Sequence, residues 1–182
     1  MKQIFFLMIF LSATFAVMAQ ERTFTFGVRA GVQLPQLNGR DKDSVGFSNN
    51  VGFIAGMTAV SPVSTHFSLK HDVWLAVNKN QASVEIFPVS PAFYYKGLEL
   101  FAGPYASLLL HGNNYGAANE QNAYAAKNDL GITIGAGYTF GKRMNVEARY
   151  VRGFIPVVED AGKQQQWKAF RQYLGITVGY NF

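Results

Sequence analysis

The sequence predicts an all-β fold, an eight-stranded antiparallel transmembrane β-barrel arranged as an up-and-down meander. Eight segments of roughly ten residues alternate apolar with small or polar residues at a period of two, the mark of strands with one apolar face. Long and short connections between them alternate, as in outer-membrane barrels. Aromatic residues make up 15% of the chain and charged residues 15%, with 18 glycines and no cysteine, which indicates a β-rich protein.

The first seven segments follow this alternation with differing regularity. The first places phenylalanine, valine and leucine on one face and glycine, Arg29 and Gln33 on the other. The fourth is the least regular, and Pro88 and Pro91 predict a bulge or bend within it. In chain order the seven predicted strands are residues 23–34, 51–60, 67–78, 83–95, 98–111, 129–140 and 144–154.

The eighth segment, residues 172–182, shows the pattern most clearly. One face is apolar, whereas the other is mostly glycine and threonine. The sequence ends at Phe182, an ending that many membrane β-barrels share. Hydrocarbon cannot hydrogen-bond free backbone groups, so a spanning sheet must close on itself. We therefore expect this strand to pair with the first. Its apolar face comprises Leu174, Ile176, Val178, Tyr180 and Phe182.

The connections predict an orientation. The tight ones are residues 61–65, 96–97 and 141–143, and the third connection, residues 79–82, is short to moderate. The long ones are residues 35–50, 112–128 and 156–169. Outer-membrane barrels have short periplasmic turns and longer extracellular loops. This parity predicts that both ends of the barrel domain face the periplasm.

The first 19 residues predict a cleaved secretory signal peptide. Lys2 precedes an apolar run over residues 4–17, and Val17-Met18-Ala19 resembles a cleavage site. The alternative is an N-terminal membrane anchor, for which the run is short. We expect residues 20–182 to form one outer-membrane β-barrel domain. The signal peptide would direct its export across the inner membrane, and the domain would reside in the outer membrane of a Gram-negative bacterium.

Charged residues on the predicted inward face form a second pattern. An eight-stranded barrel has only enough interior for side chains, and a buried charge needs a partner. We therefore expect a network of ion pairs that fills the lumen; a selectivity constriction or a proton path is the alternative. The expected barrel-interior charge network comprises Arg29, Lys70, Asp72, Glu85, Glu99, Glu147 and Arg149.

Outward aromatic residues gather near the strand ends assigned to the periplasm. Such a girdle at one bilayer interface is typical of outer-membrane barrels. The expected periplasmic girdle comprises Phe24, Phe26, Phe67, Tyr94, Tyr138, Phe140, Tyr180 and Phe182.

Several motifs resemble the PorT-like outer-membrane β-barrel family. They are Phe26-Gly-Val-Arg-Ala-Gly-Val-Gln-Leu34, Phe67-Ser-Leu-Lys-His-Asp-Val-Trp-Leu75, Ala102-Gly-Pro-Tyr-Ala106 and Leu174-Gly-Ile-Thr-Val-Gly-Tyr-Asn-Phe182. The resemblance spans nearly all of residues 20–182 and implies an eight-stranded barrel inserted by the outer-membrane assembly machinery. Members include a protein needed for secretion of other proteins. The proline-rich fourth strand and His71 depart from the family pattern, which bears on the register of strands three and four.

The sequence favours a non-enzymatic protein. His66-Phe67-Ser68 fits a lipid A deacylase pattern, but it lies at a predicted periplasmic turn, away from the outer leaflet. His111 could join Asp129 and Glu159-Asp160 in a protease-like site at the extracellular rim, but the omptin-like proteases that have such a site are larger barrels. We expect no catalytic, cofactor-binding or metal-binding residues. The cations are too scattered for nucleic acid.

The long loops are the expected route to function. Tyr115, Tyr124 and Trp167 suit contacts with lipopolysaccharide or a partner protein. We expect a structural or interaction role through these loops. A narrow channel or an accessory of a secretion apparatus is the first alternative, and a lipid- or peptide-modifying enzyme is the second. A soluble lipocalin-like barrel would need an apolar interior and a polar exterior.

Overall fold

A computed structural model describes residues 24–38, 51–79, 81–112, 123–125, 128–141, 143–160 and 168–182. The predicted signal peptide, the loop residues Tyr115 and Trp167 and most of the long connections lie outside the described residues. No helix in the described part of the chain is long and apolar enough to cross a membrane.

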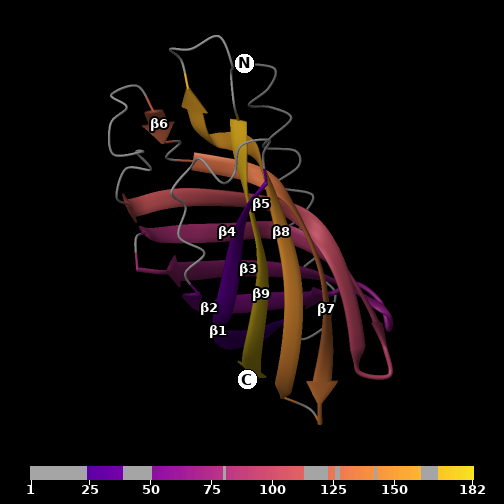
Figure 1. Cartoon of the computed structure of the whole chain (residues 1–182). Coiled ribbons are helices and arrows are strands. Elements are labelled where there is room, and N and C mark those ends of the chain that lie inside the picture. Colours follow the sequence, from indigo (N-terminus) through magenta and orange to yellow (C-terminus); the bar gives the residue numbers. More distant parts are fainter. Residues whose placement is uncertain are drawn as a thin grey trace, which may run out of the picture.

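Eight long strands form a closed antiparallel barrel (Figure 1). Consecutive long strands are neighbours around the barrel, so the topology is the predicted meander. One more strand, the short β6, pairs with the C-terminal part of β8 and was not predicted from the sequence. The strands are β1 Thr25–Asn38, β2 Gly52–Pro62, β3 Phe67–Val77, β4 Gln81–Tyr95, β5 Leu98–Gly112, β6 Ala123–Ala125, β7 Asn128–Phe140, β8 Met144–Asp160 and β9 Lys168–Asn181.

The first and last strands close the barrel, as predicted. β1 lies beside β9 (Figure 1), in an antiparallel register that sets Ala30 opposite Val178. Gly31 lies at this seam, and a Cβ there would collide with the backbone carbonyl of Ile176. Glycine on the inward face therefore lets the two strand backbones approach closely at the seam.

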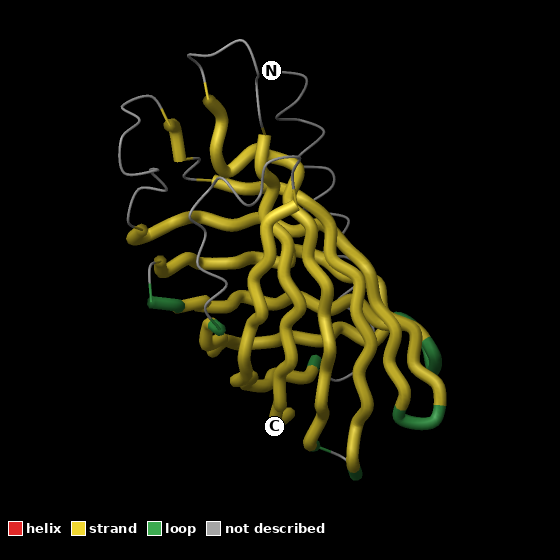
Figure 2. The backbone as a smooth tube through the Cα atoms, in the orientation of Figure 1, coloured by secondary structure: helices red, strands yellow, loops and turns green. Residues whose placement is uncertain are grey.

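The three tight connections lie at one end of the barrel, which we call the turn end. They join β2 to β3, β4 to β5 and β7 to β8 (Figure 2). Lys96, Gly97 and Gly141 adopt positive φ angles in two of these turns, a conformation that suits tight hairpins. The opposite end is called the loop end. There β8 extends to Asp160 and β9 begins at Lys168, so the predicted long connection 156–169 is wrong in its bounds, because both strands continue past the expected membrane edge.

The fourth strand contains the predicted irregularity. Lys70 pairs with Ser90 and Asp72 with Phe87, so β4 has one residue more than β3 over this stretch. Such a bulge shifts the side-chain alternation by one position. As a result, Tyr94 lies half-buried on the inner face, and its prediction as an outward residue is wrong.

The two faces of the barrel wall differ sharply in polarity. Large apolar side chains point outward, with exposed fractions of 71% at Phe53 and 60% at Ile134. Charged side chains point inward, where Lys70 and Arg149 are buried. Soluble proteins seldom expose a continuous apolar surface of this kind. The arrangement is the reverse of the soluble lipocalin-like alternative and is that of a transmembrane barrel.

Candidate functional site

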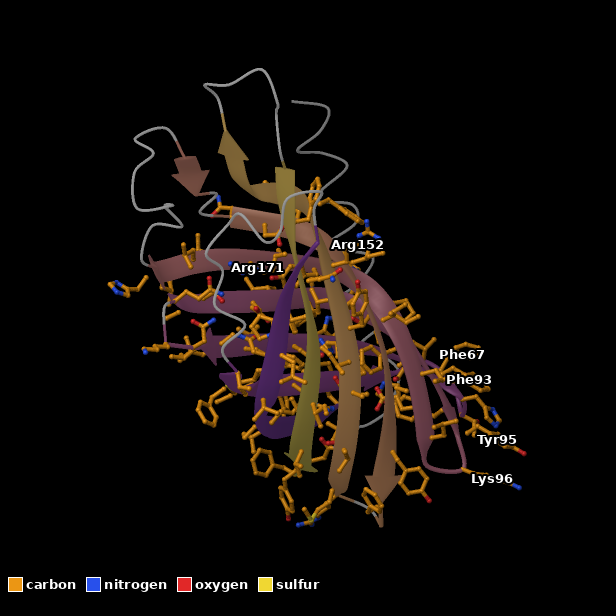
Figure 3. All side chains as sticks on the ribbon, in the orientation of Figure 1. Phe67, Phe93, Tyr95, Lys96, Arg152 and Arg171 are labelled. Atoms are coloured by element: carbon orange, nitrogen blue, oxygen red, sulfur yellow. The ribbon has the colours of Figure 1, made fainter. Side chains whose placement is uncertain are left out.

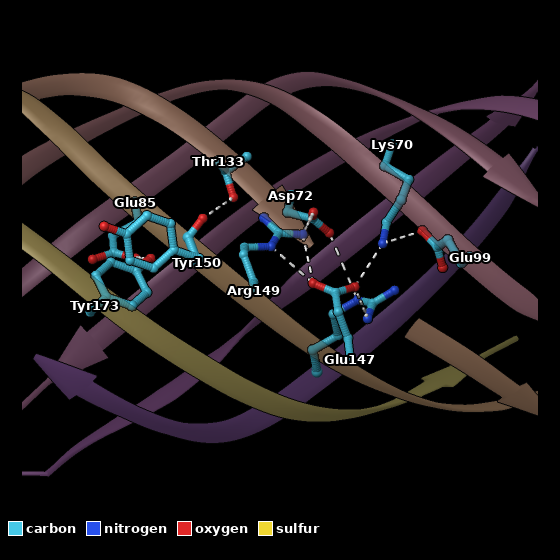
Figure 4. A network of polar contacts seen from close by, with 10 residues as sticks. Lys70, Asp72, Glu85, Glu99, Thr133, Glu147, Arg149, Tyr150 and Tyr173 are labelled. Carbon is cyan, nitrogen blue, oxygen red and sulfur yellow. Dashed lines mark hydrogen bonds and ion pairs between the residues drawn. The ribbon is translucent and has the colours of Figure 1, made fainter. Parts of the chain in front are cut away.

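The interior near the turn end holds a cluster of ion pairs centred on Glu147 of β8 (Figure 4). Its carboxylate lies 2.7 Å from Arg29 Nη1 of β1 and 2.7 Å from Lys70 Nζ of β3. Arg149, two residues further along β8, approaches the other carboxylate oxygen at 2.8 Å. Period-two alternation puts Glu147 and Arg149 on one face, and barrel closure brings β1 and β3 within reach.

Three further ion pairs complete this cluster, one of them between Arg29 Nε and Asp72 Oδ1 at 3.8 Å. Arg149 Nη2 donates a hydrogen bond to Asp72 Oδ2 at 2.5 Å, and Lys70 Nζ lies 2.5 Å from Glu99 Oε1. Arg29, Lys70 and Arg149 thus face three carboxylates. We call these six residues, Arg29, Lys70, Asp72, Glu99, Glu147 and Arg149, the ion-pair layer.

The ion-pair layer contains equal numbers of cationic side chains and carboxylates. All six residues are buried, with exposed fractions of 3% or less. Charges removed from water lose hydration, and mutual attraction offsets that loss only when each charge has close partners. Removal of a single member would leave one unit of the opposite charge buried in excess.

An aromatic layer lies next to the ion-pair layer. The ring centroids of Trp74 and Phe87 are 4.9 Å apart, those of Phe87 and Tyr105 5.5 Å, and those of Tyr105 and Tyr173 6.4 Å. The Arg149 guanidinium carbon lies 4.1 Å from the Phe87 ring centroid, so a cation–π contact joins the two layers. The rings come from β3, β4, β5 and β9 and so bridge the lumen from several sides.

A second polar cluster lies beyond the aromatic layer, toward the loop end. Glu85 accepts a hydrogen bond from the Tyr173 hydroxyl, so it lies apart from the ion-pair layer with which the sequence had grouped it (Figure 4). Arg171 Nη1 donates to Ser107 Oγ at 3.0 Å. Asp129, also buried, accepts from the backbone N–H of Ile155 at 3.3 Å. The interior therefore alternates charged, aromatic and polar layers.

Sequence reasoning missed Arg171 as an interior residue. The predicted eighth strand began one residue later, at 172. The same period-two pattern, extended backward from Tyr173, would have put Arg171 on the inward face. The alternation therefore includes Arg171, but the predicted strand began after it.

The arrangement can fill and rigidify the barrel. Its described carboxylates contact cations, a tyrosine hydroxyl or, at Asp129, a backbone N–H. Among the residues that the structure describes, no group of three or more His, Asp or Glu side chains could hold a metal ion.

The histidine candidates are not brought together with catalytic partners within the described residues. His66 lies exposed in the turn between β2 and β3, with its ring stacked 6.1 Å from that of Phe93. Ser68 is buried in the interior, so the two side chains of the deacylase-like pattern lie on opposite sides of the wall. His111 is exposed at the loop end, whereas Asp129 is buried; the side chains of Glu159 and Asp160 lie outside the described residues.

Aromatic side chains surround the outer surface at the turn end. Phe67 and Phe93 have ring centroids 5.2 Å apart, and Lys96 lies over the Tyr95 ring (Figure 3). Phe93 and Tyr95 thus occupy the outward positions that had been assigned to Tyr94. The other predicted girdle residues lie on this surface, six of them exposed and Phe24 half-buried against Phe26: Phe24, Phe26, Phe67, Tyr138, Phe140, Tyr180 and Phe182.

Comparisons with known proteins agree with this architecture. Residues 87–159 match a family model described as the outer membrane protein beta-barrel domain. No curated protein sequence matches the chain. Neisserial surface protein A (NspA) has a similar solved structure, with a TM-score of 0.51 and 15% identity over 88% of this chain and 100% of that one. This similarity supports the fold.

Two structures from Pseudomonas aeruginosa are more distantly similar. The outer membrane protein OprG has a TM-score of 0.47 and 12% identity over 88% of this chain and 97% of that one. The N-terminal β-barrel domain of OprF has a TM-score of 0.44 and 12% identity over 86% of this chain and 97% of that one. The family match and the NspA-like fold together support an eight-stranded outer-membrane barrel, and with it a place in the bacterial outer membrane.

Proposed function

We propose that this protein is a non-enzymatic outer-membrane β-barrel with a closed interior, whose role is structural or depends on contacts made by its extracellular loops. In this proposal the loop end faces the cell exterior and the turn end faces the periplasm. Residues 1–19 direct export, and the outer-membrane assembly machinery inserts the barrel. The motifs that resemble PorT-like barrels support membership in that group.

The observation that carries the proposal is the filled lumen. Two successive layers, one of ion pairs and one of aromatic rings, cross the interior between the turn end and the loop end. An ion that passed through would have to separate Glu147 from its three cations and displace Phe87 and Tyr105. Such a rearrangement breaks buried charge contacts, each of which is costly to leave unmade. A packed core fits a scaffold better than it fits a pore.

The loop end is then the part of the protein available for partners outside the cell. We propose that its loops bind lipopolysaccharide or a partner protein. The aromatic and amide residues of the loop sequences, among them Tyr124 and Gln164, are of the kinds common at protein interfaces.

Planar-bilayer recording tests the closed interior. Residues 20–182 are refolded in detergent, checked for heat-modifiable migration on a gel, and added to a planar lipid bilayer beside a porin that serves as a positive control. We expect no steady unit conductance from the refolded protein. A reproducible conductance step would overturn the proposal in favour of the narrow-channel alternative.

A deletion strain tests the secretion alternative. We expect the strain to secrete the same proteins as its parent. A secreted proteome that changes, and that returns when the gene is restored, would favour an accessory role in secretion instead.

A further inference from the structure

Among the side chains that the structure describes on the strands, one charged side chain interrupts the apolar outer surface of the barrel between its two ends. Arg152 of β8 points outward and is exposed, near the loop end (Figure 3). Its direct neighbours across the sheet are Ile132 on β7 and Gln172 on β9. One row closer to the turn end, Tyr150 lies between Ile134 and Leu174. Toward the loop end, the next outward residue of β8 is the exposed Phe154, and Leu130 of β7 is also exposed. Arg152 therefore lies within the upper part of an apolar strip.

The polar neighbours of Arg152 lie across the sheet on β9 and one row below on β8. The Tyr150 hydroxyl donates a hydrogen bond to Gln172 Oε1 at 2.8 Å, which forms a polar pair next to Arg152 in the sheet. Below this pair the outward residues of β8 and β9 are Ala148, Ile176 and Val178. A molecule bound here would meet a cation and two polar groups at one end and hydrocarbon-like surface at the other.

No described carboxylate balances Arg152. The five acidic residues whose side chains the structure describes all face the interior, where their exposed fractions are 4% or less: Asp72, Glu85, Glu99, Asp129 and Glu147. The ion pairs among the described residues all lie in the lumen. An arginine on a lipid-facing surface costs free energy unless it reaches the interface or an anion.

The height of Arg152 on the barrel places it at an interface. Met144 marks the turn end of β8, in the same row as Phe140 and Tyr180 of the girdle. Eight residues separate it from Arg152, which is about 20 Å along the barrel axis for a rise of about 3.3 Å per residue and a tilt of about 40°. The apolar band of such barrels is about 25 Å tall. Arg152 thus lies a few ångströms inside the outer edge of this band, where its long side chain can reach the lipid headgroups.

We propose that Arg152, beside the Tyr150–Gln172 pair, binds the phosphate of an anionic saccharolipid headgroup in the outer leaflet. The planar guanidinium can donate two parallel hydrogen bonds to a phosphate, the geometry for which arginine is best suited. The acyl chains then lie along the strip formed by Leu174, Ile176 and Ile134. This site rests on the proposed orientation, with the loop end at the cell exterior.

Native mass spectrometry of the refolded protein tests the site. The protein is mixed with diphosphoryl lipid A, with the same lipid after removal of its phosphates, and with inorganic phosphate as a competitor. The test variant is Arg152→Gln. The matched control is Lys96→Gln, which removes one outward cation at the turn end. Each variant must first show heat-modifiable migration equal to that of the wild type.

We expect Arg152→Gln to weaken retention of diphosphoryl lipid A about tenfold, since a charge-assisted hydrogen bond is lost. Lys96→Gln and the wild type should retain it equally, and the dephosphorylated lipid should bind weakly to all three. Equal retention by Arg152→Gln and the wild type would overturn the site. Effective competition by inorganic phosphate would also overturn it, because the ligand would then be free phosphate. Either result leaves the closed interior untouched, since bilayer conductance measures that separately.

Discussion

Glu147 is the side chain on which the interior charges converge. Its two carboxylate oxygens approach Arg29, Lys70 and Arg149, at distances of 2.7 to 2.8 Å. Glu147 therefore pairs with all three cations, whereas Asp72 and Glu99 supply the other two negative charges. The free energy of folding should depend strongly on this single residue, because each cation would otherwise be buried with too little opposing charge.

Glu147→Gln should lower the free energy of unfolding by roughly 3–5 kcal/mol. The shape of the side chain is kept, so the loss reports the missing charge rather than a cavity. Urea-induced unfolding in phospholipid vesicles, followed by tryptophan fluorescence and gel migration, measures the change. A loss below about 0.5 kcal/mol, the range of ordinary surface substitutions, would contradict the account.

The matched control for Glu147→Gln is the double variant Arg29→Gln/Glu147→Gln. It removes one cation and one anion together and leaves Lys70 paired with Glu99 and Arg149 paired with Asp72. The double variant should therefore be less destabilised than the sum of the two single variants, by about 1–3 kcal/mol. Strict additivity would mean that the two charges do not interact.

The β1–β9 seam is the feature that turns the sheet into a barrel. The two strands pair over a long register that includes Ala30 with Val178 and Leu34 with Leu174. No cysteine occurs in the sequence, so an engineered pair can report this contact without background.

A disulfide should form between cysteines at positions 30 and 178. Directly opposite residues on paired strands have Cα atoms within the range that a disulfide spans. The control pair, Ala30→Cys with Leu174→Cys, lies four residues out of register, about 13 Å along the strand. Oxidation of folded protein, followed by gels with and without reductant, measures the cross-link. An uncross-linked 30–178 pair, or equal cross-linking of both pairs, would contradict the closure.

At the scale of elements, the sequence predicted the number and the faces of the long strands, but not the position of the bulge, the short strand β6 or the strand ends. Alternation predicted eight strands and their outward faces because lipid imposes a strict period of two on a spanning strand. Pro88 and Pro91 indicated a bulge, but neither fixes its position, and one residue of slip turned Tyr94 inward. The short strand β6 carries no alternation long enough to detect. The predicted strands stopped short at the loop end, and the late start predicted for the eighth strand concealed Arg171.

The interior was predictable in composition and only partly in pairing. The seven inward charges could be read from the alternation of single strands. Which charges meet depends on barrel closure and stagger, which join residues far apart in the chain, such as Lys70 and Glu147. The grouping of Glu85 with the ion-pair layer failed for this reason, since Tyr173 on β9 is the residue that reaches it.

Across the whole molecule, acidic and basic side chains are distributed differently between the lumen and the outside of the barrel. The described acidic side chains lie inside, and the described outward cations are Lys79, Lys96, Arg143 and Arg152. Between the aromatic girdle at the turn end and Arg152 near the loop end, the outer surface of β7, β8 and β9 is apolar. This distribution suits a bilayer, because hydrocarbon excludes charge and closure satisfies the backbone.

The central claim is that the apolar outer face contacts lipid, and spin-label accessibility tests it most directly. Single cysteines at positions 146, 148, 176 and 178, each on the outer face, are labelled in refolded protein in vesicles, with position 96 in a turn as the water-exposed reference. We predict high collision rates with oxygen and low rates with a water-soluble nickel chelate, with the greatest contrast at Ala148, near mid-membrane. Nickel accessibility at Ala148 equal to that at Lys96 would contradict the membrane-spanning barrel.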